Sequence, residues 1–327
     1  MRSSTTPFVT VAVCTRDRPE QLEKLLASAA ELEVPAGLSW ELLVVDNGSG
    51  ESVEAIVARF QSQLPLRLVV EPEPGLSNAR NRAVAVARGS YICWTDDDAL
   101  LGRDWLRAYV AAFRRHPESA VFGGPILARL EEPSPRWVRA SLDRSPLPSA
   151  FAHLEIDEER PIGRHLEQSP WGANFATRTA EQRQLAYDPQ LGRSPRHARL
   201  GEECDLIVRL MDRGATGYWI PDAVVHHCIP LARQTRRQAW AYFTSVGETL
   251  QHCSPDAARR WSTAGLLVRI SAYAALFGIA SSLGRHRHAT IFMARAGIYT
   301  GMLRSRRSAR ADGRVASGAI SKQEAFP

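Results

Sequence analysis

Three consecutive aspartates, Asp96, Asp97 and Asp98, are the feature of this sequence that most directly suggests chemistry. They follow the apolar run 91–94, which has the character of a buried strand. Adjacent carboxylates repel one another, so they are kept together either in water or around a cation. Mg²⁺ and Mn²⁺ bind carboxylate oxygens and substrate phosphates at the same time. The aspartates therefore indicate a metal and nucleotide site, and the alternative is a solvated acidic turn that caps a helix.

Side chains alternate along an extended segment, and this alternation predicts different roles for the three aspartates. Asp96 and Asp98 are expected on one side, with Asp98 on the metal ion and Asp96 on the ribose or a metal-bound water. Asp97 is either a further nucleotide contact or a spacer. His227 follows an apolar segment far along the chain. It is expected to complete the metal shell or to contact the diphosphate, and the alternative is a structural histidine.

Polar residues also follow two other apolar runs. Thr15 and Arg16 come after the run 8–14, and Asp46 comes after the run 41–45. A carboxylate at Asp46 can accept a hydrogen bond from a base or a ribose hydroxyl, although a plain Asx turn is the alternative.

Two arginines are candidates for binding a diphosphate. Arg80 lies early in a helix expected from about 77 to 87, and a helix N-terminus with an arginine suits phosphate oxygens. Arg233 is expected to neutralise the phosphate of a leaving group. The alternative for Arg80 is a surface arginine in an arginine-rich chain.

The acidic segment Glu202, Glu203 and Asp205 opens another expected helix, 202–213. A carboxylate there can act as a general base that deprotonates an attacking hydroxyl. Glu203 is the favoured candidate, with Glu202 and Asp205 as further candidates. The alternative is a set of acids that interact favourably with the helix dipole.

These residues need a scaffold, and the apolar pattern predicts one. Short apolar runs alternate with segments of helical spacing, which favours a mostly parallel sheet flanked by helices in an α/β fold. Ligands of such sheets bind beyond the carboxyl ends of the strands, so the three polar strand ends are expected to converge. The expected strands are 8–14, 41–45, 66–70, 90–94 and a later strand 217–225. Residues 130–170, rich in Pro, Arg, Ser and Glu, predict an irregular excursion that acts as a lid.

The C-terminal part has a different character. Segments 263–283 and 289–303 each contain one arginine among apolar or small residues, and further arginines flank them. Such a pair of helices suits either an anionic membrane interface or a packed core. The formal net charge of +6 is compatible with nucleotide phosphates or anionic lipid. Neither zinc-finger spacing nor interleaved RNA-binding aromatics are present, so nucleic acid is not an expected partner. Five scattered cysteines without a C-x-x-C pair indicate a cytoplasmic protein.

Taken together and in order, these motifs resemble the inverting family 2 glycosyltransferases from about Phe8 to Leu250. The matching segments are 11–19, 44–49, Gly75 with 79–81, the aspartate triplet as the D-x-D motif, 171–174, 201–209 and 224–230. At the position of Glu203 the family often has aspartate. It often has Tyr-Asn where this chain has Arg16 and Asp17.

The resemblance implies a GT-A fold with a Rossmann-like, mostly parallel central sheet. It implies nucleotide-sugar contacts from Thr15, Arg16, Asp46, Arg80, Asp96 and Asp97, and acceptor contacts from Trp171, Gly172 and Asn174. It also implies a Mg²⁺- or Mn²⁺-dependent displacement with inversion, most often from a uridine diphosphate sugar. The expected acceptor is a hydroxyl of a glycan or a lipid-linked molecule in cell-surface polysaccharide or glycolipid synthesis. The expected location is the cytoplasm, at the inner face of the cell membrane.

The expected domains are a glycosyltransferase domain at 1–255, a helical tail at 256–310 and a disordered C-terminus at 311–327. Within the first, 8–125 binds the nucleotide and 126–255 binds the acceptor. A catalytically inactive, membrane-docked scaffold is the second hypothesis. A sugar nucleotidyltransferase or a dinucleotide-dependent oxidoreductase would need a glycine-rich loop after the first strand, and 15–19 contains no glycine.

Overall fold

The computed structural model describes residues 8–142, 147–163, 169–253 and 261–311. The chain divides into two compact units. One, which we call the sheet unit, comprises residues 1–129, 154–197 and 201–228; the other, the helical unit, comprises 130–153, 198–200 and 229–327. Each is described by itself. Of the segment expected to be disordered, 311–327, only Ala311 lies within the described residues, at the end of the last helix.

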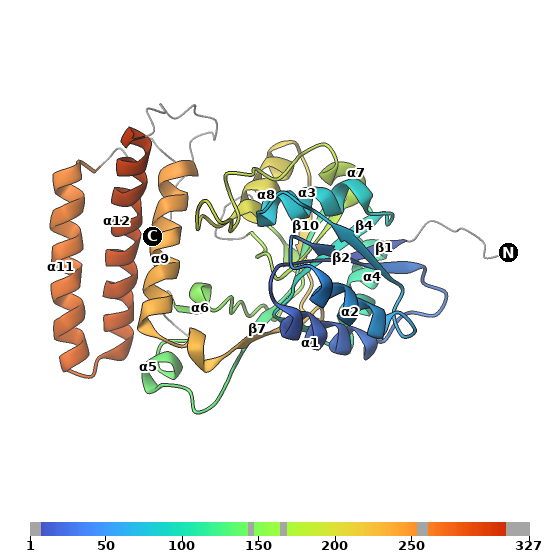
Figure 1. Ribbon diagram of the computed structural model, residues 1–327, viewed down its shortest axis with the longest axis horizontal. Coiled ribbons are helices and arrows are strands. Elements are labelled where there is room, and N and C mark those ends of the chain that lie inside the picture. Colours follow the sequence, from blue (N-terminus) through green and yellow to red (C-terminus); the bar gives the residue numbers. More distant parts are fainter. Residues whose placement is uncertain (1–7, 143–146, 164–168, 254–260, 312–327) are drawn as a thin grey trace. The chain divides into compact units, whose positions relative to one another are not determined.

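The sheet unit contains a large mixed sheet with helices on both faces (Figure 1). Its strand order is β3-β2-β1-β4-β9-β6-β10-β8. The first four strands run parallel to one another and confirm the expected apolar runs within two residues. They are β1 (Val9–Thr15), β2 (Trp40–Asp46), β3 (Leu66–Val70) and β4 (Tyr91–Asp96).

The helices between these strands follow the expected spacing. Helix α1 (Pro19–Ala30) begins with a proline, which the first turn tolerates, and buries Leu22, Leu25 and Leu26. The next two are α2 (Glu51–Phe60) and α3 (Leu76–Val86). Helix α3 and helix α8 (Glu202–Asp212) pack on the sheet face that contains Leu43, Ile92 and Trp94.

The second half of the sheet is largely antiparallel. Strand β9 (Asn174–Arg178) runs antiparallel to both β4 and β6 (Val121–Gly123). Strand β10 (Gly217–Trp219) is parallel to β6 and antiparallel to the two-residue β8 (Arg160–Pro161). Two helices complete this half, α4 (Trp105–Arg115) and α7 (Thr179–Gln182).

The expected single strand 217–225 is wrong. The chain forms β10, turns at Pro221, and then forms β11 (Val225–Ile229) in a second sheet. Proline lacks the N–H needed to continue a ladder, which is the physical reason for the break. The second sheet has the order β5-β11-β7, with β5 (Ala99–Leu101) and β7 (Ile126–Leu130). His227 therefore lies within a strand instead of after one.

The expected irregular excursion at 130–170 contains two short helices, α5 (Arg136–Arg139) and α6 (Leu147–Ala150), in addition to β8. Its segments 143–146 and 164–168 lie outside the described residues. A role as a lid stays a prediction.

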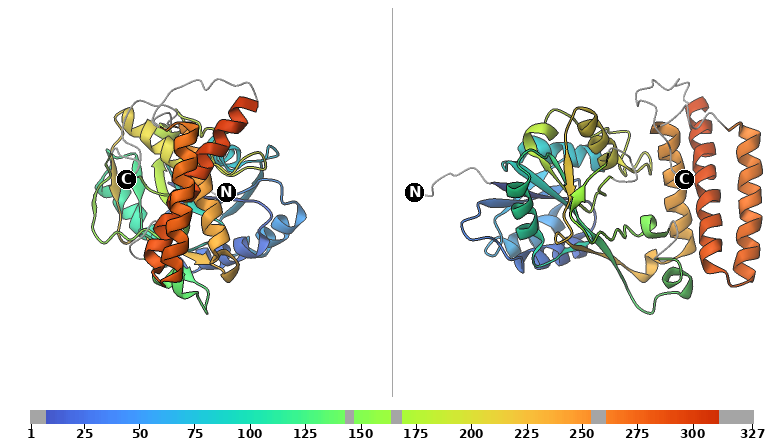
Figure 2. Two further views of the ribbon diagram at one scale, coloured as in Figure 1. Left: turned by 90° about the vertical axis from the view of Figure 1, so that its left-hand side faces the viewer. Right: turned by 180° about the vertical axis from the view of Figure 1, so that it is seen from behind.

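In the described part of the helical unit there are three long helices, α9 (Arg236–Cys253), α11 (Thr263–Ser282) and α12 (His286–Ala311). Helix α12 packs against both α9 and α11 (Figure 2). The contact with α9 is very close: a Cβ atom added at Gly301 would lie 1.9 Å from the carbonyl oxygen of Thr244, and one at Gly247 would lie 2.0 Å from that of Ile298. The absence of side chains at these glycines lets the two backbones touch.

Candidate active site

Asp97 joins the aspartate triplet to the first strand. Strands β1 and β4 are neighbours, so the residues that follow them lie side by side. Thr15 Oγ1 donates a hydrogen bond to Asp97 Oδ2 at 2.8 Å, and Arg18 Nη1 donates to Asp97 Oδ1 at 3.1 Å. Arg18 also reaches Asp98 Oδ2 at 3.3 Å. Asp97 is only 5% exposed. It is therefore more than a spacer, because it fixes the turn that carries the other two aspartates.

Burial and two neighbouring carboxylates oppose the ionisation of Asp97, in spite of its contact with Arg18. Burial raises the pKa of Asp97 to about 6, helped by the charges of Asp98 and Asp96 and opposed by Arg18 and Thr15. A carboxyl group that is harder to ionise than usual, beside two further carboxylates, indicates a site that an additional cation would stabilise.

Asp98 lies beside His227, as the sequence predicts for a shared metal site. The antiparallel pairing of β5 with β11 places His227 opposite Ala99, the residue after Asp98. The result is a distance of 3.2 Å between His227 Nε2 and Asp98 Oδ1. Within the described residues, no group of three or more His, Cys, Asp and Glu side chains is arranged to hold a metal ion. The protein would thus contribute Asp98 and His227, and a substrate or water would complete the shell.

Asp96 points to Arg80. Arg80 Nη2 lies 3.4 Å from Asp96 Oδ1, and the Asp96 side chain remains 37% exposed. The alternative of a surface arginine is excluded, since Arg80 is only 2% exposed. Its guanidinium packs against the aromatic rings of Trp94, Phe175 and Tyr187, with ring centroids 5.6–5.8 Å away. Small residues on α3 and its packing on the sheet carry Arg80 into the interior.

Arg80 also contacts the acidic start of α8. Its Nη1 atom lies 3.1 Å from Glu202 Oε1 and 3.9 Å from Glu203 Oε2, and its Nη2 donates to the carbonyl oxygen of Gly172 at 3.4 Å. One buried cation therefore connects Asp96 on β4, two glutamates on α8 and the loop before β9. A role in binding diphosphate stays a prediction, whereas a role in organising these carboxylates is visible.

The three acids of α8 have different surroundings. The helix starts after Gly201, whose φ of +82° is a conformation that glycine adopts readily. The Glu202 side chain is 4% exposed and turned to Arg80. Glu203 is 13% exposed, and its Oε1 accepts a hydrogen bond from the backbone N–H of Gly172 at 3.1 Å. Asp205 pairs with Arg209 at 2.7 Å. Of the three carboxylates, that of Glu203 best combines partial exposure with a fixed orientation.

Burial, together with the neighbouring charge of Glu203, raises the pKa of Glu202, and Arg80 opposes this shift. Glu202 thus depends on Arg80, which compensates its buried charge, and Arg80 has in Glu202 the nearest of its three carboxylate partners.

The loop 171–174 is shaped by Asn174. The side-chain oxygen of Asn174 accepts from Trp105 and Tyr109 at 2.8 Å each, and its amide donates to the carbonyl oxygens of Pro125 and Ala223. Asn174 is 0% exposed, so in this structure its amide positions the loop. Gly172 is buried and Trp171 half-buried. Binding of an acceptor by these residues stays a prediction.

Asp46 forms the Asx-type turn that the sequence analysis gives as an alternative. Its carboxylate accepts from the backbone N–H groups of Ser49 at 2.8 Å and Gly50 at 3.3 Å. The next residue, Asn47, accepts from the N–H of Gly75 and ties this turn to the start of α3. Arg16 is half-buried beside Asp17. The nucleotide contacts of Asp46 and Arg16 stay predictions.

Arg18 and Asn47 are the site residues that the sequence analysis does not single out. Both belong to polar turns at strand ends, and this location is the signal that could have identified them. Arg233 lies in the short 3-10 turn Leu231–Arg233 of the helical unit, and its contribution to the site stays a prediction.

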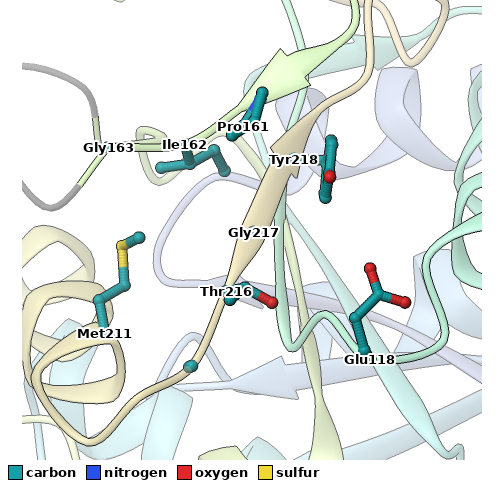
Figure 3. A pocket seen from close by; sticks show the side chains of 9 residues that line it. Glu118, Pro161, Ile162, Gly163, Met211, Thr216, Gly217 and Tyr218 are labelled. Carbon is teal, nitrogen blue, oxygen red and sulfur yellow. The ribbon is translucent and has the colours of Figure 1, made fainter.

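A separate small cavity lies at the edge of the sheet. It has a volume of about 280 Å³ and is lined by residues in or next to β8, β10 and the end of α8, among them Ile162, Met211, Thr216 and Tyr218 (Figure 3). None of the candidate active-site residues described above lines it.

Known proteins share both the sequence pattern and the fold. The family model described as "Glycosyl transferase family 2" matches residues 10–176. The chain is 26% identical over 306 residues to the succinoglycan biosynthesis protein ExoM of Rhizobium meliloti, covering 91% of this chain and 94% of that protein.

Among solved structures, a similar one is the mannosyltransferase PcManGT of Pyrobaculum calidifontis in complex with GDP-Man and Mn²⁺. Its TM-score is 0.60 at 20% identity, covering 93% of this chain and 88% of that one. Another is residues 1–349 of TarS from S. aureus, with a TM-score of 0.51 at 16% identity, covering 96% and 94%. These likenesses confirm the expected fold: a mixed α/β sheet, mostly parallel, followed by helices.

Proposed function

Because the chain belongs to glycosyl transferase family 2, we propose that it transfers a sugar from a nucleoside diphosphate sugar to a hydroxyl group with inversion at the anomeric carbon. A uridine diphosphate sugar is the favoured donor, and a glycan or lipid-linked molecule of cell-surface polysaccharide or glycolipid synthesis is the acceptor. The observation that carries the proposal is the contact network of the sheet unit, which joins Asp96–Asp98, Arg80 and Glu203. The similarity of the chain to a succinoglycan biosynthesis protein supports the choice of acceptor class.

The donor set at Asp98 suits a divalent cation. A carboxylate and an imidazole lie 3.2 Å apart, and the neighbouring Asp97 has a raised pKa that an added positive charge would lower. Mg²⁺ and Mn²⁺ retain open positions for phosphate oxygens and water, and Mn²⁺ accepts the imidazole nitrogen more readily. When bound, such an ion stabilises the negative charge that develops on the departing nucleoside diphosphate.

Arg18 is placed to help the leaving group. Its side chain is 45% exposed and holds Asp97 and Asp98, so the guanidinium is fixed at one side and open to solvent on the other. A cation at this position can bind diphosphate oxygens and stabilise their charge during the displacement.

Glu203 is the proposed general base. Its Oε1 is held by the N–H of Gly172, and Arg80 lies at 3.9 Å from its Oε2. These two contacts fix the direction of the carboxylate, which must accept the proton of the acceptor hydroxyl as that oxygen attacks. Glu202 neutralises Arg80 in the interior, so that Arg80 orients Glu203 without trapping it in a close ion pair.

Nucleotide binding and catalysis are tested separately. Thermal unfolding is measured with UDP, GDP and dTDP, each with and without Mn²⁺, and a specific site gives stabilisation that grows with ligand concentration. Asp98→Ala is expected to abolish the Mn²⁺-dependent part of the shift, whereas Asp104→Ala, at an exposed aspartate on the same unit, retains it. Glu203→Gln is expected to keep the nucleotide shift and to lose sugar transfer by roughly 10²–10⁴-fold.

The results discriminate among the hypotheses. A nucleotide shift without any donor turnover would support the inactive scaffold. The absence of a metal-dependent shift with every nucleotide, or full transfer by Glu203→Gln, would overturn the proposed mechanism.

A further inference from the structure

Helix α11 exposes an unusually large apolar surface. Of the eight large apolar side chains that are exposed among the described residues, five belong to α11 or to the residue that follows it. Their exposed fractions range from 40% to 67%, the highest being that of Val268. The helix is long and apolar enough to cross a membrane, the only one of its kind in the described parts of the chain, and only 11% of its apolar window is buried.

The exposed side of α11 has no charged residue. One row of side chains, from Leu266 through Ile270 to Ala280, recurs at helical spacing and is turned inward, where Leu266 packs against Met302 and Leu303 of α12. The single charge of α11, Arg269, stacks on the ring of Trp261 with 3.4 Å between guanidinium and ring centroid. Exposed helix faces in water normally carry charges, so this face requires a cover.

The charges around α11 indicate what covers it. From residue 261 to residue 311 the sequence has eight arginines and neither aspartate nor glutamate. Arg285 and Arg287 lie exposed after the C-terminal end of α11, and Arg304 and Arg307 lie exposed on the last part of α12. A second copy of this chain would bring the same positive charges to the contact, whereas phosphate groups of anionic lipids would neutralise them.

We propose that α11 inserts into the hydrocarbon of an anionic lipid bilayer, with the flanking arginines at the phosphate level. At about 1.5 Å per residue, its 20 residues match a hydrocarbon thickness of about 30 Å. A helix that lies flat in the interface has one strongly charged face. Because α11 has none, insertion fits better than the surface position expected from the sequence.

The anionic leaflet of a cell membrane is the cytoplasmic one, which agrees with the location expected from the cysteines. A membrane-bound enzyme meets acceptors that are themselves held in the membrane. We therefore infer a lipid-linked acceptor, and this inference rests on the proposed function. The inference that α11 contacts lipid does not rest on it.

Flotation of the full-length protein with vesicles tests the proposal. Vesicles of phosphatidylcholine with phosphatidylglycerol are compared with vesicles of pure phosphatidylcholine, at low salt and in about 1 M salt. At the high salt concentration the screening length is about 3 Å, so attraction between exposed charges is largely removed. The wild type is expected to float with the anionic vesicles and to stay bound after the salt wash. Val268→Glu with Ile279→Glu, two exposed positions on one face, is expected to lower binding by more than about tenfold.

Two controls separate the alternatives. Val34→Glu adds the same charge at an exposed valine of the sheet unit and is expected to leave binding unchanged. Asp98→Ala is expected to lose catalysis but to float like the wild type, so failure of the proposed function and failure of this inference are distinguishable. The inference would be overturned if the wild type did not float or if salt released it from the vesicles. It would also be overturned if the protein formed a salt-stable dimer that the double variant Val268→Glu with Ile279→Glu dissociates.

Discussion

At the scale of single residues, the site depends on one buried cation and the groups arranged around it. Arg80 is 2% exposed, and it faces Glu202, Glu203, Asp96 and the carbonyl oxygen of Gly172. Adjacent glutamates on one helix thereby acquire different roles: Glu202 compensates the buried charge, and Glu203 remains accessible. This difference depends on spacing: Arg80 Nη1 lies 3.1 Å from Glu202 Oε1 but 3.9 Å from Glu203 Oε2.

Gly172→Ala tests this spacing. A Cβ atom at Gly172 would lie 2.7 Å from Arg80 Nη2, so Arg80 must shift, whereas the 3.5 Å to the Glu203 carboxyl carbon is an ordinary contact. A shift of Arg80 changes its distances to Asp96 and to the two glutamates. We expect kcat to fall by roughly 10- to 100-fold, with the nucleotide-induced thermal shift unchanged, in steady-state kinetics of the purified protein. Gly278→Ala, where nothing lies within 4 Å, is the matched control. Normal kcat in Gly172→Ala would contradict the role given to this contact.

The residue types of the site could be read from the sequence, but their partners could not. The proximity of Asp98 and His227 agrees with the prediction because strand pairing fixes it. The roles of Asp97 and Arg80 depend on side-chain directions in a turn and on helix packing. The local sequence pattern does not determine these directions. Strand β4 ends at Asp96, so the alternation of side chains along a strand does not apply to Asp97 and Asp98.

At the scale of elements, Glu41 ties together the amino end of the parallel strands. Its carboxylate, on β2, accepts from Thr10 of β1 at 2.7 Å, from Arg67 of β3 at 2.9 and 3.1 Å, and from the backbone N–H of Arg88 at 2.8 Å. Burial alone would raise the pKa of Glu41, but the hydrogen bonds from Arg67, Thr10 and Arg88 lower it.

Acid unfolding should therefore depend on Glu41. With a lowered pKa in the folded state, Glu41 contributes stability that is complete above its unfolded pKa and is lost as the pH falls through its folded pKa. We expect Glu41→Gln to lose about 3 kcal/mol at pH 7 and to show a shallower loss than the wild type from pH 5 to pH 3, measured by urea unfolding. Glu54→Gln, at an exposed position of α2, should match the wild type, and equal pH profiles for Glu41→Gln and the wild type would refute the assignment.

Elements with strong apolar periodicity were predictable, and those set by sheet partners were not. Strands β1, β2 and β4 are buried along nearly their whole length, so their residues form largely apolar runs, whereas the edge strand β3 is only partly buried. Strands β5, β6 and β10 have three residues each, too few to show a period. Their existence depends on neighbours distant in the sequence, which explains the error at 217–225.

At the scale of the whole molecule, the two units are stabilised by different means. The sheet unit has a core of large apolar side chains around Trp94 and Phe175. The helical unit relies on close backbone contact between α9 and α12 at Gly247, Gly297 and Gly301. A substitution is therefore expected to disturb side-chain packing in the first unit and backbone contact in the second.

Gly301→Ala separates these two means of stabilisation. In an open helix, alanine is more stabilising than glycine by about 1 kcal/mol, as expected for Gly278→Ala. At Gly301 the added Cβ would meet the Thr244 carbonyl oxygen at 1.9 Å, so the sign should reverse and the variant should be less stable. Hydrogen exchange followed by mass spectrometry should show faster exchange in α9 and α12 and unchanged exchange in β1 to β4, with the nucleotide-induced shift preserved. Faster exchange in both sets of elements would mean that the chain unfolds as a single cooperative structure, and a stabilised variant would mean that the α9–α12 contact is looser than these distances require.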